Sequence, residues 1–405
     1  MSKTLPTVLQ IIPKLDSGGA ERTVVEMSDA IVRAGARALV LAEDGRLAAD
    51  VRAAGGEIID FPAATKNPLK IWSNSRGIAR IVAAEGVDLI HARSRAPAWS
   101  ALLACRRLGL PFVTTYHGAY NETGRIKRAY NSVMAQSDVV IANSNYTAGL
   151  IASRYNTPVA KIRVIYRGID PVRFDAMRVE PERIATLRDA WGVAPTARVI
   201  LQTARLTGWK GQTVLIEAAG KLLAEGRLGD AVVVLAGEAQ GRDGYVAQLN
   251  ARIRSLGLEG RVVLAGHVDD VPAAYMTAHV TVVASTEPEA FGRSAAEAEA
   301  MGCPVIATNI GAPPETVRAA PAFTSDQATG WLVNPGDAVE LADVLAASMA
   351  MPDAERSAMG ARARRYVLQA FSLDALKQQT LAVYDERLGT DLAARFQVAI
   401  GDRIS

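Results

Sequence analysis

Short β-branched apolar runs alternate with amphipathic stretches of helical period along most of the chain. This rhythm predicts parallel sheets built from strand–helix–strand units. In the stretch Glu21–Ala34, for example, Val24, Met27 and Ile31 fall on one helical face. We therefore expect an α/β protein.

The predicted strands form two series, and a chain of 405 residues is long enough for two hydrophobic cores. The first series is Val8–Ile12, Ala38–Leu41, Glu57–Asp60, Leu89–His91, Phe112–Tyr116, Val139–Ala142 and Arg163–Tyr166. The second is Arg198–Thr203, Ala231–Leu235, Val262–Ala265, Val280–Ala284, Val305–Ala307 and Trp331–Val333. The prolines that break the rhythm between them are Pro171, Pro181 and Pro195.

We place an N-terminal Rossmann-like domain at residues 1–172 and a second at residues 173–370. After Asp337 the pattern is helical, and it closes with a helix over Leu373–Leu388 and a polar tail. We expect this last segment, residues 371–405, to return to the first domain.

The composition, with 49% hydrophobic and 21% charged residues, is typical of a globular protein. Cys105 and Cys303 are too few for a disulfide framework or a cysteine-based zinc site. The sequence shows no export leader and no apolar run of about 20 residues. Cytoplasmic residence is the resulting expectation.

The charge is uneven: residues 66–130 hold 11 Lys and Arg against 3 Asp and Glu, a net charge of +8 in a chain of +3. The basic clusters are Lys66, Lys70, Arg76 and Arg80, then Arg106 and Arg107, then Arg125, Lys127 and Arg128, with Trp72 and Trp99 among them. They are either solvated helix faces or a surface for an anionic acceptor or membrane. Nothing in the pattern points to nucleic acid.

Ligands of open parallel sheets bind beyond the carboxyl ends of the strands, which directs attention to the loops there. After the first strand, Gly18 and Gly19 precede a helix whose free N–H groups favour an anion. The same pair is also ordinary turn chemistry. His117 follows a later strand, where it either reaches a ligand or is a surface histidine.

The loop after the first strand of the second series carries Arg205 and Lys210. Two cations at this position suit a diphosphate, although solvated loop residues are the alternative.

Two carboxylates eight positions apart, Glu289 and Glu297, mark the segment Pro288–Val305. We expect Glu289 in a loop and Glu297 about two turns into the next helix, both facing one ligand. Complementing the helix dipole is an alternative for Glu289, but it leaves Phe291 and Gly292 unexplained. Glu299 lies about 200° around the helix from Glu297, so we expect it to be solvated.

With these residues in view, the chain resembles glycosyltransferase family 4, retaining enzymes that use nucleotide sugars. The resemblance rests on Glu289–Glu297 with seven residues between, on the run to Val305, and on ordered elements in both halves. The ordered elements are Gly18 to Glu21, His117-Gly118, Arg205 with Lys210-Gly211, Gly311 with Pro314-Glu315, and Gly330 to Val333.

The resemblance implies two facing Rossmann-like domains, the GT-B fold, with the donor in the cleft between them. It assigns Arg205 and Lys210 to the donor diphosphate, Glu297 to the ribose and Glu289 to the transferred sugar. The further contacts it implies are Gly18 and Gly19 to phosphates or sugar, His117 to the sugar, Gly237 with His267 and Val268 to the base, and Phe291 and Gly292 beside the donor. Arg167, where many relatives have asparagine, is an additional candidate contact.

No Asp-x-Asp pair occurs, so we expect no metal and no cofactor, with the two cations in place of a divalent ion. A nicotinamide-dependent oxidoreductase and a non-catalytic sugar-nucleotide-binding module are the rival interpretations. The first lacks a G-x-G-x-x-G turn. We expect transfer from a UDP- or GDP-sugar to a glycan or lipid-linked glycan such as a lipopolysaccharide core, at the inner face of the membrane.

Overall fold

The computed structural model describes residues 5–16, 18–120, 122 and 124–401. By its internal contacts the chain divides into two compact units. The first unit comprises residues 1–166 and 374–405, and the second comprises residues 167–373. We describe each by itself.

The first unit contains a seven-stranded parallel sheet in the order β3-β2-β1-β4-β5-β6-β7. Its strands are β1 (Thr7–Lys14), β2 (Arg37–Glu43), β3 (Glu57–Asp60), β4 (Leu89–Ala92), β5 (Phe112–Tyr116), β6 (Val139–Ala142) and β7 (Ile162–Val164). Most are apolar runs because both faces of the sheet are covered. The strand order reverses between β1 and β4, where doubly wound sheets bind ligands.

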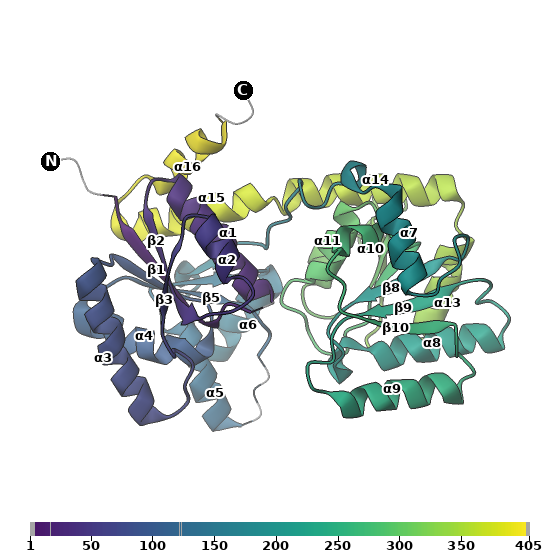
Figure 1. The fold of residues 1–405 in the computed structure, drawn as a ribbon, viewed down its shortest axis with the longest axis horizontal. Helices are drawn as coiled ribbons and strands as arrows, with labels where there is room; N and C mark the ends of the chain where they lie inside the picture. The colour runs from purple at the N-terminus through teal and green to yellow at the C-terminus, as the bar shows by residue number, and fades with distance from the viewer. Residues whose placement is uncertain (1–4, 17, 121, 123, 402–405) are drawn as a thin grey trace. The chain divides into compact units, whose positions relative to one another are not determined.

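Helices cover both faces of this sheet (Figure 1). They are α1 (Gly19–Arg33), α2 (Ala48–Ala53), α3 (Pro68–Glu85), α4 (Arg95–Leu108), α5 (Arg125–Asn131), α6 (Asn145–Tyr155), α15 (Leu373–Leu388) and α16 (Leu392–Gly401). One core joins the sheet to α3 and α4. A second core joins it to α1, α15 and α16, so α15 and α16 complete the first unit, and a smaller third core lies between β1, β2, α1 and α2.

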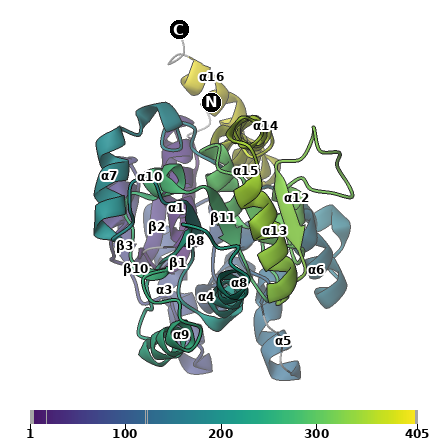
Figure 2. The same ribbon diagram turned by 90° about the vertical axis from the view of Figure 1, so that its right-hand side faces the viewer.

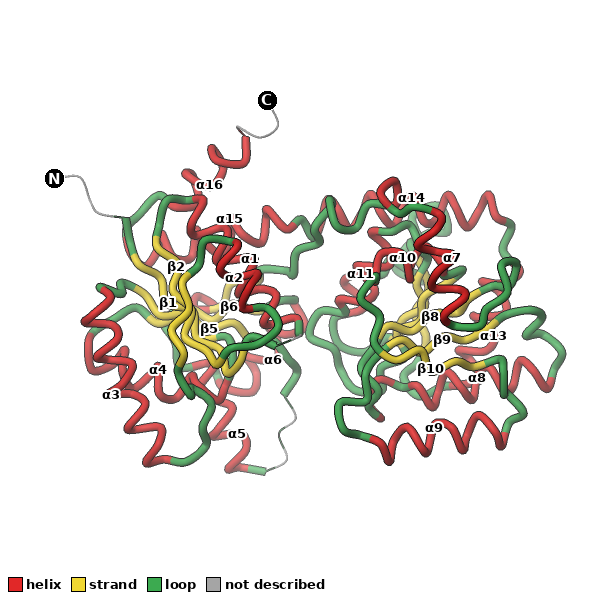
Figure 3. Tube along the Cα trace, in the orientation of Figure 1, coloured by secondary structure: helices red, strands yellow, loops and turns green. Residues whose placement is uncertain are grey.

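The second unit contains a six-stranded parallel sheet in the order β10-β9-β8-β11-β12-β13. Its strands are β8 (Val199–Thr203), β9 (Val232–Ala236), β10 (Val262–Gly266), β11 (Val280–Val283), β12 (Val305–Thr308) and β13 (Gly330–Val333). Its helices are α7 (Pro181–Ala190), α8 (Gln212–Ala224), α9 (Asp243–Ser255), α10 (Val271–Thr277), α11 (Arg293–Ala300), α12 (Pro313–Thr316), α13 (Ala338–Ala350) and α14 (Asp353–Ala370). Figure 2 shows them around the sheet, and Figure 3 marks the strands in yellow. The larger core packs α8, α9 and α13 on one face.

Every strand that the sequence predicts is present, with ends shifted by a few residues. The predicted helix at Glu21–Ala34 corresponds to α1, and Val24, Met27 and Ile31 are buried. The sequence predicts a polar tail after Leu388, but residues 392–401 form a helix, α16, so this prediction is wrong for them. Leu392 and Phe396 are fully buried there, and two apolar residues four apart suffice to dock a short helix.

Candidate active site

The loop after β8 is held close to the backbone that follows β11. Gly211 has a positive φ of 71°, and a Cβ there would lie 1.8 Å from the Ala284 carbonyl oxygen. No side chain fits at this position, so the glycine is fixed by packing. Arg205 lies earlier in the loop with an exposed side chain and forms no ion pair within the described residues. Its guanidinium is available to an anion.

Lys210 and Glu289 form an ion pair at this edge of the second sheet. Lys210 Nζ lies 2.7 Å from Glu289 Oε1, with side chains only 14% and 10% exposed. Lys210 also lies over the Trp209 ring, 4.4 Å from its centroid. Such partial burial strengthens the attraction relative to a surface pair. The sequence predicts both residues as site residues but not their direct contact.

The Glu289 loop is fixed by its neighbours. Ser285 Oγ donates a hydrogen bond to Glu289 Oε1. The Glu289 backbone forms a bridge to Gly311, and its carbonyl accepts from the Ala312 N–H at 2.9 Å. A Cβ on Gly311 would lie 2.6 Å from Glu289 backbone atoms. Glu289 is therefore presented by a rigid loop and not by a mobile one.

Glu297 is the fifth residue of α11, little more than one turn from its start, so the expected two turns is wrong. The helix begins later than predicted because Gly292, with φ of 82°, precedes it in a left-handed conformation. Arg293 Nε donates to Glu297 Oε1 at 2.7 Å, and Tyr275 Oη donates to Oε2 at 3.4 Å. Since a carboxylate has about four acceptor positions, it retains capacity for a ligand.

The other predicted residues of the second unit lie in varied surroundings. Phe291 is buried, and its ring packs edge-to-face on Phe371 with centroids 5.3 Å apart. His267 is exposed after β10, with Nε2 2.9 Å from Asp269 Oδ1. Gly237 follows β9 and would clash with the Ala204 carbonyl if it had a Cβ, at 1.9 Å. Arg167 is buried, and Val268 is half-buried.

In the first unit, three predicted residues lie at the carboxyl end of the sheet. Gly18 is exposed and is the N-cap of α1, without a side-chain cap. Gly19 begins the helix. His117 directly follows β5 and is half-buried.

Glu299 is a correction: it is fully buried and not solvated. Its side of α11 packs toward α14, which covers the helix. Burial raises the pKa of this carboxyl well above its usual range, more than the neighbouring Thr329 and Arg318 lower it. The sequence predicts a solvated Glu299 because the periodicity of one segment does not show that a short helix is packed on two sides.

The sequence of this chain matches two protein-family models and a number of known proteins. Residues 17–173 match Glycosyltransferase Family 4, and residues 184–366 match Glycosyl transferases group 1. A D-inositol 3-phosphate glycosyltransferase of Xylanimonas cellulosilytica is 30% identical over 91% of this chain and 92% of its own. The chain belongs to glycosyltransferase family 4. It is thus a glycosyltransferase, and the oxidoreductase and non-catalytic interpretations are wrong.

Solved structures agree with this family membership. A glycosyltransferase of Rickettsia africae has a TM-score of 0.85 and 32% identity, over 96% of this chain and 100% of the other. HepE of Anabaena, solved with UDP-glucose, has a TM-score of 0.80 and 25% identity, over 94% and 99%. The fold of this family 4 protein is therefore GT-B, with two Rossmann-like domains.

Sequence reasoning missed three residues that position the two glutamates. Arg293 was recoverable, because it stands four residues before Glu297 on one helix face. Ser285 and Tyr275 offered no such signal, since each comes from a different stretch of chain. Tyr275 also bonds Thr203 at the end of β8, at 2.8 Å, and so links α10 and α11 to the sheet.

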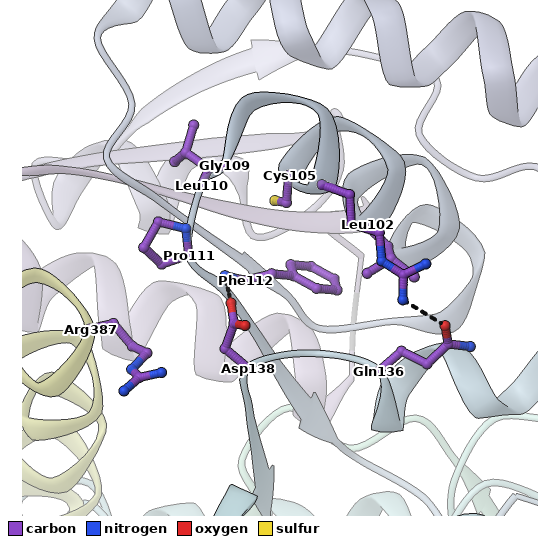
Figure 4. A pocket seen from close by; sticks show the side chains of 10 residues that line it. Leu102, Cys105, Gly109, Leu110, Pro111, Phe112, Gln136, Asp138 and Arg387 are labelled. Carbon is purple, nitrogen blue, oxygen red and sulfur yellow. Dashed lines mark hydrogen bonds between the residues drawn. The ribbon is translucent and has the colours of Figure 1, made fainter.

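The cavities of this glycosyltransferase include two away from the predicted residues. One of about 420 Å³ lies in the first unit between α4, the start of β5 and Arg387 (Figure 4). Another of about 460 Å³ lies beside β13 and α14. Within the described ranges, no helix is long and apolar enough to cross a membrane, and no group of three or more metal-ligating side chains occurs.

Proposed function

We propose that this family 4 enzyme transfers a hexose-type sugar with retention from a UDP- or GDP-sugar. The observation that carries the proposal is the close pair formed by Lys210 and Glu289, 2.7 Å apart, together with the exposed cation of Arg205 in the same loop as Lys210. A diphosphate and a sugar are adjacent groups of one donor. The cation of Lys210 suits the diphosphate and the carboxylate of Glu289 suits the sugar, and their contact places these two side chains next to each other.

In this proposal Arg205 and Lys210 hold the diphosphate, Glu289 accepts hydrogen bonds from the transferred sugar, and Glu297 accepts them from the ribose. The remaining roles follow the family resemblance: Gly237, His267 and Val268 at the base, Phe291 and Gly292 shaping the loop, Gly18, Gly19 and His117 from the first unit, and Arg167 as an added contact. The rigid Glu289 loop and the Arg293–Glu297 pair support preorganised hydrogen bonding.

The reaction breaks the bond between the anomeric carbon and the distal phosphate oxygen. Negative charge develops on that phosphate, and Lys210 and Arg205 stabilise it. We propose attack of the acceptor hydroxyl on the same face through an oxocarbenium-like state. The departing phosphate then takes the hydroxyl proton, so the products are the glycoside and the nucleoside diphosphate, and no separate base is required.

We further propose that no divalent metal takes part, because two cationic side chains occupy the loop where a metal would neutralise the diphosphate. Activity should survive EDTA without loss. A full loss that magnesium or manganese restores would contradict this assignment.

The donor and acceptor are proposed from relatives. HepE is solved with UDP-glucose, which makes UDP-glucose the first donor to test. One relative carries the name D-inositol 3-phosphate glycosyltransferase, and another of Bacillus anthracis is an N-acetyl-alpha-D-glucosaminyl L-malate synthase. A phosphorylated or otherwise anionic acceptor, including a phosphorylated lipid-linked glycan or lipopolysaccharide core, suits the basic first unit.

We also propose that α3 meets an anionic membrane from the cytoplasmic side. Leu69 and Trp72 are exposed by 79% and 54%, and Arg76 stacks over the Trp72 ring at 3.6 Å. Positions 69, 72 and 76 share a helical face. Lys66, two residues before α3, and Lys70, in its first turn, are also exposed. Exposed apolar residues among cations are typical of an interfacial surface.

The decisive experiment is a screen of nucleotide sugars for release of the nucleoside diphosphate with each candidate acceptor. Product analysis by NMR then gives the anomeric configuration. Retention of configuration with one UDP- or GDP-hexose is the expected result, and an inverted product would contradict the mechanism.

A further inference from the structure

A buried polar chain crosses the first unit on the face that α1 and α15 cover. At its centre His91 of β4 is fully buried. Its Nδ1 lies 2.7 Å from the Tyr384 hydroxyl, and its Nε2 lies 2.7 Å from Thr115 Oγ1. Because Tyr384 belongs to α15 and Thr115 to β5, one imidazole links the C-terminal helix to the middle of the sheet.

A cation stands at one end of this chain. Arg93, two residues after His91, is 2% exposed, and its Nε donates to Gln10 Oε1 at 2.8 Å. Its guanidinium also lies beside the Tyr384 hydroxyl. Burial lowers the pKa of Arg93, and Tyr384 together with the Glu26 carboxylate offsets part of this shift. A guanidinium has donors only, so the Tyr384 oxygen presents a lone pair to it.

This cation gives the chain a direction. The contact between His91 Nδ1 and the Tyr384 hydroxyl has no direction of its own, because it depends on the tautomer of His91. With one lone pair turned to Arg93, the arrangement that leaves no buried hydroxyl hydrogen without an acceptor is the one in which Tyr384 donates to Nδ1. Burial lowers the pKa of His91 well below its ordinary value, so the ring is neutral and carries one hydrogen. Since Nδ1 accepts, that hydrogen is on Nε2 and is donated to Thr115 Oγ1.

We propose that Tyr384 is a positioning residue for sugar transfer, fixing the Nε2–H form of His91 and thereby holding Thr115 at the end of β5. Thr115 is the penultimate residue of β5, and His117 directly follows the strand, two residues after Thr115. The inference rests on the proposed function only in giving His117 a role in the reaction. If Tyr384 only filled space in the core, its hydroxyl would not need to stand in series with a cation, a neutral imidazole and a threonine.

The test uses the four histidines of the chain, few enough to assign one by one in an ¹⁵N-histidine sample of the full protein. Tyr384→Phe removes one oxygen and keeps the ring. We expect the His91 ring to lose its single Nε2–H signature, and turnover to fall about 3- to 10-fold, the scale of one neutral hydrogen bond, with the donor KM unchanged.

Leu381→Val is the matched control, because Leu381 is fully buried on the same helix and makes no side-chain hydrogen bond. It should lower Tm and leave both the tautomer and turnover unchanged. Thr115→Val breaks the chain from the other end, and combined with Tyr384→Phe it should lower turnover no further than either variant alone. If Tyr384→Phe does not fold, Thr115→Val alone serves the turnover test.

An unchanged tautomer in Tyr384→Phe, or a changed tautomer with wild-type turnover, would overturn the proposal. The tautomer is measured without substrate. A wild-type enzyme that retains the Nε2–H form while His117→Ala keeps full turnover would therefore contradict the proposed role of His117 and not the hydrogen-bond chain.

Discussion

The two units treat charge differently. In the second unit, Lys210 pairs with Glu289 and Arg293 with Glu297, each pair 2.7 Å apart near the ends of strands. In the first unit, the cations of α3 are exposed, and the buried Arg93 has Gln10, Tyr384 and the Glu26 carboxylate as its neighbours. Paired charges near a strand end suit fixed recognition of one ligand, whereas unpaired surface cations suit a broad anionic partner.

Each unit also buries a side chain that is charged in water, Arg93 in the first unit and Glu299 in the second, and the chemistry of these two side chains differs. Arg93 cannot lose its proton at ordinary pH, and the first unit surrounds it with the acceptors of Gln10 and Tyr384 and with the negative charge of Glu26. Glu299 can be protonated, and burial raises its pKa well above the usual range. A buried arginine stays charged and needs hydrogen-bond acceptors around it, whereas a buried glutamic acid becomes neutral when it binds a proton.

The largest expected effect is on turnover, and it concerns the two cations of the loop after β8, Arg205 and Lys210. Arg205→Ala and Lys210→Ala should each lower turnover roughly 10²-fold, because each removes a preorganised partner of the leaving phosphate. Steady-state kinetics with the donor found by the screen measures this. Lys221→Ala removes a half-buried cation of α8 that is paired with Glu225; it is the control and should retain wild-type turnover.

Stability should distinguish the same two variants. Lys210→Ala leaves Glu289 largely buried without its cation and should lower Tm, whereas exposed Arg205→Ala should not. Near-wild-type turnover in both variants would remove the diphosphate assignment.

The second prediction concerns Glu297. Glu297→Ala removes a carboxylate proposed to accept from ribose hydroxyls, so affinity for the nucleoside diphosphate should fall by about 1.5–3 kcal/mol. Isothermal titration with UDP and GDP measures it. Arg293→Ala is the informative companion: it removes the partner but not the acceptor, and it should weaken binding less. Equal UDP affinity in wild type and Glu297→Ala would end the ribose assignment.

How far the sequence could predict this molecule depends on the range of the interactions. Strands such as Val139–Ala142 are local apolar runs, and their predicted limits match β6. Glu289 and Glu297 stand out through spacing and family resemblance. The Tyr384–His91 contact joins residues 293 positions apart, and the burial of Glu299 depends on α14, so neither has a local signal.

The third prediction tests the unpaired cations of the first unit. Lys66→Glu with Lys70→Glu should weaken binding to anionic vesicles by at least about 2 kcal/mol, since each basic residue near such a surface contributes about 1 kcal/mol. Cosedimentation with anionic and neutral vesicles at low and high salt measures this. Arg106→Glu with Arg107→Glu makes the same change in net charge on α4 and should matter less. Equal binding by all variants and to both vesicle types would contradict the surface.

The smallest expected effect is a pH-dependent gain in stability for Glu299→Gln. The folded-state pKa of Glu299 is raised above its unfolded value, so the folded state binds more protons in between. Its contribution to stability is therefore present below the unfolded pKa of about 4.5 and is lost as the pH rises toward the folded value. Glutamine stays neutral, so Glu299→Gln should exceed wild type in Tm by a few degrees at pH 8 and by less at pH 5. Glu297→Gln, on the same helix but paired with Arg293, should show no such gain. Thermal melts of the three proteins at both pH values measure the difference, and a gain equal at pH 5 and pH 8 would show that Glu299 is not the group that titrates.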